Sequence, residues 1–167
     1  TLYELFGDKE ELIYHSIKHY LEQSRERRIR QVINLENPLE IMVVCIRDMI
    51  DGAPVAGRIR RNMRRFYPSV YAKLEEEIQD ASQNDLRRWM SECLECGYFD
   101  KRIRAEYAIK LIHHSVHGVL VNTLDEETPS NELISLMSYS LLVFIRGLCT
   151  IDGQSIIDDC TQKYFSV

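Results

Sequence analysis

Three histidines are the residues of this chain whose spacing comes closest to that of a metal site. His113 and His117 are four positions apart, with His114 between them, so a helix would place the first two on one face. Asp125 and Glu126 follow soon after. No HExxH-type base accompanies the cluster, and the interpretation we favour is an interface or pocket position. A helical metal protein or enzyme that uses these histidines is the alternative.

A CxxC pair, Cys93 and Cys96, has the spacing of redox and zinc motifs. We expect it at the C-terminal end of a helix, where the helix dipole opposes a thiolate. A zinc site would need a second pair of ligands nearby, and the sequence has none. We therefore predict that Cys93 is a core residue and that Cys96 ends the helix. The five cysteines are odd in number and scattered, which indicates reduced thiols in a cytoplasmic protein.

Five arginines lie within eight positions, at 58, 60, 61, 64 and 65. They could bind an anionic effector or an acidic helix such as that carrying Glu75, Glu76 and Glu77, although a run of like charges is more often a solvated face. The chain has no Ser-His-Asp order, Gly-rich phosphate loop or paired-carboxylate site. We predict that it is no enzyme and that it holds no metal or cofactor.

The elements that position these residues are predicted to be helices throughout. The chain has 167 residues with 45% apolar and 28% charged side chains, and only 7 Gly and 4 Pro interrupt it. Periodic apolar positions recur at helical spacing, and no strand-length alternation stands out. No apolar run approaches the length of a membrane span, and no signal peptide opens the chain. The formal net charge of −5 is unlike that of a free-standing nucleic-acid binder.

Capping residues and Gly or Pro positions predict where the helices begin and end. We expect one break inside the region after Asn37, where Asp51-Gly52 would end a helix and Ala53-Pro54 would separate it from the next. The final helix is expected only after Asp152-Gly153. The predicted helices are 9–34, 38–51, 55–66, 68–96, 104–122, 130–149 and 155–165.

The first thirteen residues predict the end of a short helix, a turn at Gly7 and the start of a second helix. Glycine takes the left-handed conformation without a Cβ clash, so Gly7 suits a turn. Asp8 would cap the second helix, with Glu10 and Glu11 in its first turn, where the helix dipole favours anions.

The pattern Thr-Leu-Tyr-x-x-Phe-x-x-Lys-Glu-x-Leu in this segment resembles the signature of the TetR family of transcriptional regulators. The resemblance implies that 1–7 end a helix-turn-helix, that 8–35 form a connector helix, and that 36–167 form an effector-binding and dimerisation domain. It also implies that Tyr3 and Lys9 contact DNA phosphates, with Thr1 beside them. A helix-turn-helix needs a supporting helix before the recognition helix. We therefore expect further helices before Thr1, and weak DNA binding by this chain alone.

The function implied by the resemblance is that of a ligand-responsive repressor. A homodimer would bind palindromic operator DNA and be released by a small hydrophobic effector. The alternative without DNA binding is a helical dimeric adaptor.

Aromatic rings with polar tips and flexible methionines gather around the Tyr67-Pro68 break and on the helices that follow it. Such side chains suit a pocket that holds an apolar body and orients it with a few hydrogen bonds. We predict an effector site there. Its residues would be Met63, Phe66, Tyr67, Tyr71, Trp89, Met90, Tyr107 and His114.

The segments 104–122 and 129–149 are apolar on nearly every face, which indicates helices buried on every face. In a domain of this size, we expect them to pack against a second copy as a two-fold four-helix bundle. The predicted interface residues are Leu111, Gly118, Val119, Ser140, Leu141, Phe144 and Gly147.

Overall fold

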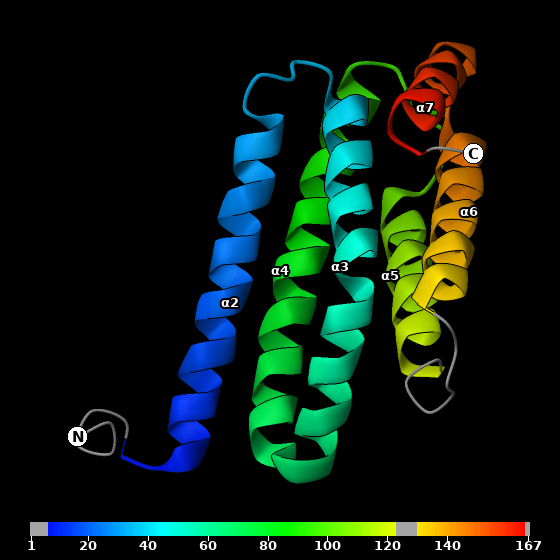
Figure 1. The fold of residues 1–167 in the computed structure, drawn as a ribbon. Coiled ribbons are helices and arrows are strands. Elements are labelled where there is room, and N and C mark those ends of the chain that lie inside the picture. The colour runs from blue at the N-terminus through cyan, green and yellow to red at the C-terminus, as the bar shows by residue number, and fades with distance from the viewer. Residues whose placement is uncertain (1–6, 123–129, 166–167) are drawn as a thin grey trace.

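The computed structural model describes residues 7–122 and 130–165, and its regular elements are all α-helices (Figure 1). Within these ranges the only β pairing is an isolated bridge between Phe99 and Cys149. The predicted all-α class is therefore confirmed. No described helix is long and apolar enough to cross a membrane. The helices are α2 (Lys9–Val32), α3 (Pro38–Phe66), α4 (Pro68–Glu95), α5 (Ala105–Asn122), α6 (Ser130–Leu148) and α7 (Ile151–Tyr164).

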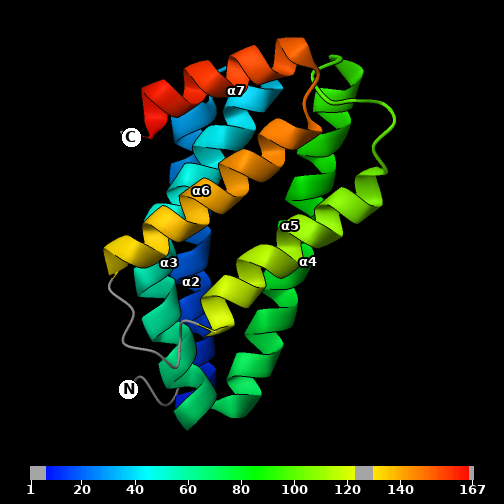
Figure 2. The same ribbon diagram turned by 90° about the vertical axis from the view of Figure 1, so that its right-hand side faces the viewer.

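Two layers make up the molecule. The long helices α2, α3 and α4 run side by side, and α5 and α6 lie across one side of α3 and α4 (Figures 1 and 2). Helix α7 crosses the end of α3. Since α2 lies on the far side of α3 and α4, it packs only against those two helices among the described elements.

Helix α3 contradicts the predicted break at Ala53-Pro54, because it continues from Pro38 to Phe66 with Pro54 inside it. A proline inside a helix removes one hydrogen bond and costs about 3 kcal/mol. Here the buried stripe runs through the proline without interruption, as Ile46, Ile50, Ala53 and Gly57 are all buried at helical spacing. Burial on both sides of Pro54 offsets the lost hydrogen bond, and the helix continues through the proline.

Other helix ends follow the predicted capping residues. The Asn37 side chain accepts hydrogen bonds from the backbone of Leu39 and Glu40 at 2.9 and 3.3 Å. Gly97, with φ of 75°, follows α4 in the left-handed conformation. The last helix differs from the prediction, because Thr150 caps it and it begins at Ile151 rather than Ser155. Gly153 was predicted to end an element but lies inside the first turn of α7.

The buried apolar side chains form two separate clusters. The main core joins α3, α4, α5, α6 and α7, and includes Leu39, Met90 and Ile145. A satellite cluster near the start of α2 consists of Tyr14, Met63, Val70 and Leu74, with Ile13, Ile17, Ile59, Tyr67 and Tyr71 packed against it. Helix α2 thus contributes one buried residue, Tyr14.

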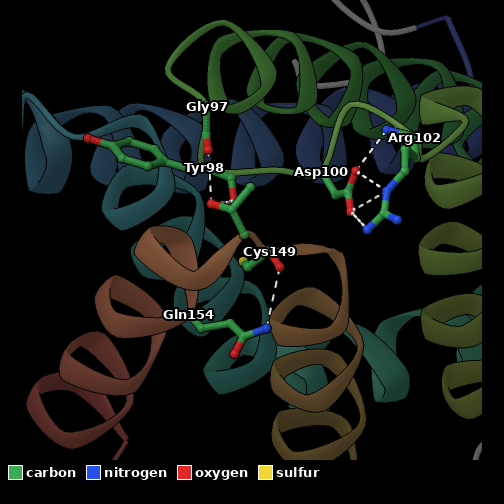
Figure 3. Close-up of polar contacts among 7 residues, drawn as sticks. Gly97, Tyr98, Asp100, Arg102, Cys149 and Gln154 are labelled. Atoms are coloured by element: carbon green, nitrogen blue, oxygen red, sulfur yellow. Dashed lines mark hydrogen bonds and ion pairs between the residues drawn. The ribbon is translucent and has the colours of Figure 1, made fainter.

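The loop after α4 lies against the junction of α6 and α7 (Figure 3), and hydrogen bonds tie the two together. The Thr150 N–H donates to the Tyr98 carbonyl at 2.9 Å, and its hydroxyl donates to the Gly97 carbonyl at 2.9 Å. The Asp100 N–H donates to the Leu148 carbonyl at 3.0 Å. This loop and junction, which we call the clasp, lie close enough that a Cβ on Gly153 would overlap the Tyr98 carbonyl oxygen.

Candidate functional site

The turn before α2 has the predicted geometry. Gly7 has φ of 55°, and the Asp8 carboxylate accepts a hydrogen bond from the Glu11 N–H at 2.8 Å. Lys9 opens α2, and its Nζ lies 5.6 Å from the centroid of the Tyr67 ring. Tyr67 lies between α3 and α4, so the start of α2 sits beside the α3–α4 turn. Thr1 and Tyr3 lie outside the described residues.

Polar contacts fasten α2 to the rest of the body along its length. Its cations face carboxylates of α3 and α4, and most of these side chains are partly exposed. Partly exposed ion pairs contribute about 0–1 kcal/mol each. The pairs are Lys18–Glu77 at 3.3 Å, Arg25–Asp85 at 3.7 Å and Arg28–Asp48 at 3.3 Å.

Tyr14 is the apolar anchor of α2 and also part of a polar network. Its hydroxyl donates to Glu77 Oε1 at 2.6 Å, and this hydrogen bond, with further contributions from Lys18, lowers the pKa of Glu77. The Lys73 ammonium lies 3.9 Å from the centroid of the Tyr14 ring. We did not predict this residue from the sequence. The signal was its place one turn before Ile17, on the side of α2 that carries the apolar residues.

The predicted effector residues do not form one group. Met63, Tyr67 and Tyr71 belong to the satellite cluster, whereas Trp89 and Met90 belong to the main core. The long helix α4 carries Tyr71 and Trp89 eighteen positions apart, which is about 27 Å along the helix axis. The two sets of residues therefore mark two different places in the molecule.

Three residues of the predicted effector site are exposed to solvent. Phe66 is a residue of the predicted effector site, but its side chain is 59% exposed. Tyr107 is 52% exposed, and His114 is also exposed. The Arg104 guanidinium lies 4.2 Å from the centroid of the Tyr107 ring. Neither α5 residue therefore packs into the core with Trp89.

Trp89 is 4% exposed, and its indole nitrogen is fully buried without a hydrogen-bond acceptor among the described residues. Leaving a buried donor unpaired costs about 1–3 kcal/mol. Most buried indole N–H groups find an acceptor. An acceptor atom brought to this nitrogen by a bound molecule would recover that energy.

The outer sides of α5 and α6 carry exposed apolar residues. Tyr107 and Leu111 are one turn apart on α5, and Leu136, Tyr139 and Val143 follow helical spacing on α6. We call these five residues the outer face. The two helices form one layer whose outer side no described element covers (Figure 2). Exposed apolar residues gathered in this way are typical of an interaction surface.

The predicted interface residues divide between this outer face and the core. Leu111, which is 55% exposed, and Gly147 lie on exposed positions, and Ser140 is half-buried. Leu141 was predicted at the interface, but it is 5% exposed and belongs to the main core, against which Phe144 also packs. The burial of Gly118 and Val119 falls outside the described part of the structure. Leu141 was assigned to the wrong face of α6 because both faces of this helix are apolar in sequence.

The prediction that Cys93 is a core residue and that Cys96 ends the helix is confirmed. Cys93 is fully buried, and burial raises its pKa to about 12, so its thiol is not activated. Cys96 is exposed next to the end of α4, and the five cysteines form no disulfide. His113 and His114 meet edge to face with ring centroids 5.7 Å apart. No group of three potential ligands could hold a metal within the described part of the chain, which leaves out the His117 side chain.

One of the five clustered arginines has the predicted acidic partner. Arg60 Nε donates to Glu75 Oε2 at 3.2 Å, between side chains that are 16% and 12% exposed. The other four, Arg58, Arg61, Arg64 and Arg65, are exposed.

Comparison of the chain with protein-family models, with curated proteins and with solved structures finds no match. The candidate sites therefore depend on the residues and their geometry.

Proposed function

We propose that the chain is the effector-binding and dimerising part of a TetR-type transcriptional repressor, with the end of its helix-turn-helix at residues 1–7 and its connector helix at α2. The resemblance of residues 1–12 to the family signature supports this assignment. The single structural observation that carries it is the attachment of α2. This helix has one buried residue and is joined to α3 and α4 by the small satellite cluster and by partly exposed ion pairs.

An attachment of this kind suits a helix that moves as a unit. Ion pairs at a partly wetted surface can lengthen or exchange at little cost, whereas an interdigitated core resists displacement. An effector that binds one tilt of α2 better than the other would shift the population between two states. In the proposed dimer, the tilt changes the separation of the two recognition helices, which must match major grooves about 34–36 Å apart.

The outer face supplies the proposed dimer contact. Two copies that meet through α5 and α6 would cover Tyr107, Leu111, Leu136, Tyr139 and Val143 in a four-helix arrangement. Val143 is 54% exposed in the single chain, so Val143→Arg should give a folded monomer. Leu141→Arg would instead place a charge in the core and unfold the chain.

Trp89 supplies the proposed contact to the effector. Its buried indole N–H, without an acceptor among the described residues, favours an effector with an apolar body and one oxygen or nitrogen acceptor. Because Trp89 is the only tryptophan of the chain, its emission reports on this place alone.

The proposal is tested by selecting operator sequences from random duplex DNA. The selection uses the protein that carries the complete helix-turn-helix implied by the resemblance. We expect a near-palindromic site bound by a dimer, with weaker binding to every sequence in Lys9→Ala. Val143→Arg should abolish cooperative binding of the two half-sites while thermal unfolding of the subunit is retained. Selection of no preferred sequence would refute the proposed function. So would operator binding by a monomer of the unmutated protein.

A further inference from the structure

One segment of this acidic chain carries positive charges and no negative ones. Between Gly52 and Leu74 lie six of its 21 Lys and Arg residues and none of its 26 Asp and Glu residues. The segment forms the second half of α3, the α3–α4 turn and the first turns of α4. Its cations are Arg58, Arg60, Arg61, Arg64, Arg65 and Lys73.

Four of these cations are available to a partner. Arg60 is engaged with Glu75, but Arg58, Arg61, Arg64 and Arg65 are exposed, and none of them pairs with a carboxylate of the described residues. We call these four arginines the basic tip. The Arg65 guanidinium lies 5.1 Å from the centroid of the Phe66 ring, which is itself 59% exposed. The Phe66 ring and the Arg65 guanidinium therefore both lie at the surface.

The basic tip lies at the end of the molecule where α2 begins (Figure 1). The 5.6 Å contact between Lys9 Nζ and the Tyr67 ring joins the first turn of α2 to the turn that follows Arg64 and Arg65. The exposed acidic residues at this end, Asp8, Glu10 and Glu11, belong to the N-cap and first turn of α2 and not to the α3–α4 turn. Lys9, the residue implied to contact phosphate, and the segment that carries the four arginines therefore lie at the same end of the molecule.

We propose that the basic tip is a second contact surface for the phosphates of duplex DNA. This proposal rests on the proposed function, in which a helix-turn-helix at the α2 end brings this end of the molecule to DNA. Exposed guanidinium groups bind phosphate oxygens through paired N–H donors, without the need for a preformed pocket. Such contacts add affinity that is independent of sequence and depends on salt. The tip would hold the protein on DNA flanking the bases that the recognition helix reads.

Duplex binding by the 167-residue chain itself tests the tip. Fluorescence anisotropy with a mixed-sequence duplex, between about 50 and 200 mM salt, should show weak binding that falls steeply with salt. The tip variant carries Gln at positions 58, 61, 64 and 65. We expect it to lose at least about tenfold in affinity at the lowest salt, and its log–log salt slope to fall by about 0.9 for each phosphate contact removed.

A matched control removes the same charge from elsewhere. Gln at Arg27, Arg30, Arg47 and Lys101 replaces four exposed cations of α2, α3 and the α4–α5 loop, away from the tip. This variant should keep most of the affinity and of the salt slope. Circular dichroism should show native helix content in both variants, since all eight side chains are exposed.

Three results would overturn the proposal. The first is that the unmutated chain shows no salt-dependent binding to the duplex. The second is that both variants lose the same affinity. The third is that binding to phosphatidylserine vesicles depends on the tip while binding to DNA does not.

Failure of the proposed function gives a different result from failure of the tip. A protein with the complete helix-turn-helix that selects no operator, but binds duplex DNA through the tip, refutes the regulator and retains the tip. Operator binding that the tip variant leaves unchanged, in affinity and salt slope, refutes the tip alone.

Discussion

The clasp, where α6 meets α7, is fastened by backbone groups, whereas the opposite end, where α2 begins, is fastened by side chains. At the clasp, the Tyr98 carbonyl accepts a hydrogen bond from the Thr150 N–H, and the Leu148 carbonyl accepts one from the Asp100 N–H. At the α2 end, Tyr14 packs in a satellite cluster, and long cationic side chains reach across to α4. Backbone groups have few alternative positions, while lysine and arginine side chains have many. The first end is built to hold its shape and the second can change it.

This difference predicts that local opening starts at α2. Segments with few buried apolar contacts open at lower free energy than the main core. Amide hydrogen exchange should therefore be faster in α2 than in α3 under native conditions.

Truncating one methionine in each cluster should have the largest effect. Met90 is 2% exposed in the main core and Met63 is 5% exposed in the satellite cluster. Each substitution by alanine should cost about 2–4 kcal/mol of the local stability. Met90→Ala should lower the global free energy of urea unfolding. Met63→Ala should chiefly speed amide exchange in α2. Equal loss of protection across all helices in both variants would show that the two clusters unfold as one.

Adding a methyl group at the clasp should have the next largest effect. At Gly153 a new Cβ would overlap the Tyr98 carbonyl oxygen and lie 3.0 Å from the Cys149 Cβ, so Gly153→Ala should cost about 1–3 kcal/mol. Gly52→Ala is the matched control, because nothing lies within 4 Å of a Cβ there. That helical position should gain about 0.5–1 kcal/mol. If the unfolding midpoints of Gly153→Ala and Gly52→Ala shifted in the same direction, the close approach at the clasp would be contradicted.

Much of the fold could be predicted because helix ends are local features. Asn37, Pro38 and Gly97 act through their own backbone and nearest neighbours, so the sequence shows their effect directly. Pro54 misled the prediction, since its local cost is outweighed by burial that only the assembled helices supply. Gly153 misled it as well. A glycine required by the close approach of another segment looks like a helix breaker in sequence.

The site residues were harder to predict because they depend on how long helices are phased and packed. In sequence, Leu141 and Leu111 look alike, yet one lies in the core and the other on the outer face. Tyr71 and Trp89 share one helix but contact different clusters. An apolar pattern gives the spacing of buried positions but not which partner covers them. The Trp89 indole N–H has no acceptor among the described residues, and this property of its surroundings leaves no trace in the sequence.

The tyrosine anchor of α2 predicts a smaller effect. Tyr14→Phe keeps the ring in the satellite cluster but removes the 2.6 Å hydrogen bond to Glu77. A hydrogen bond to a charged group at a partly wetted site contributes about 1 kcal/mol. Amide exchange in the first turns of α2 should rise accordingly. Tyr20→Phe, on the same helix at 38% exposure, should change exchange by less than about 0.5 kcal/mol. A larger effect at Tyr20 than at Tyr14 would mean that the anchor is misplaced.

The smallest effect expected is a pH dependence at the clasp end, where α7 meets α3. The Lys163 ammonium at 2.8 Å, and then the Tyr164 hydroxyl at 2.6 Å, hold the pKa of Glu40 below its ordinary value. A carboxyl group with a depressed pKa stabilises the folded state at pH above its ordinary pKa of about 4.5, and that contribution disappears as the pH falls through the folded value. Wild type and Glu40→Gln should therefore differ in unfolding free energy near neutral pH, by less than about 1 kcal/mol, and converge in acid.

Asp100 gives the matching comparison, because hydrogen bonds from Arg102 lower the pKa of its carboxyl group to about 2. The difference between wild type and Asp100→Asn should therefore persist to lower pH than the difference at Glu40. If the order of loss were reversed, with Asp100 failing before Glu40 as acid is added, the ion pair beside the clasp would be weaker in solution than its geometry indicates.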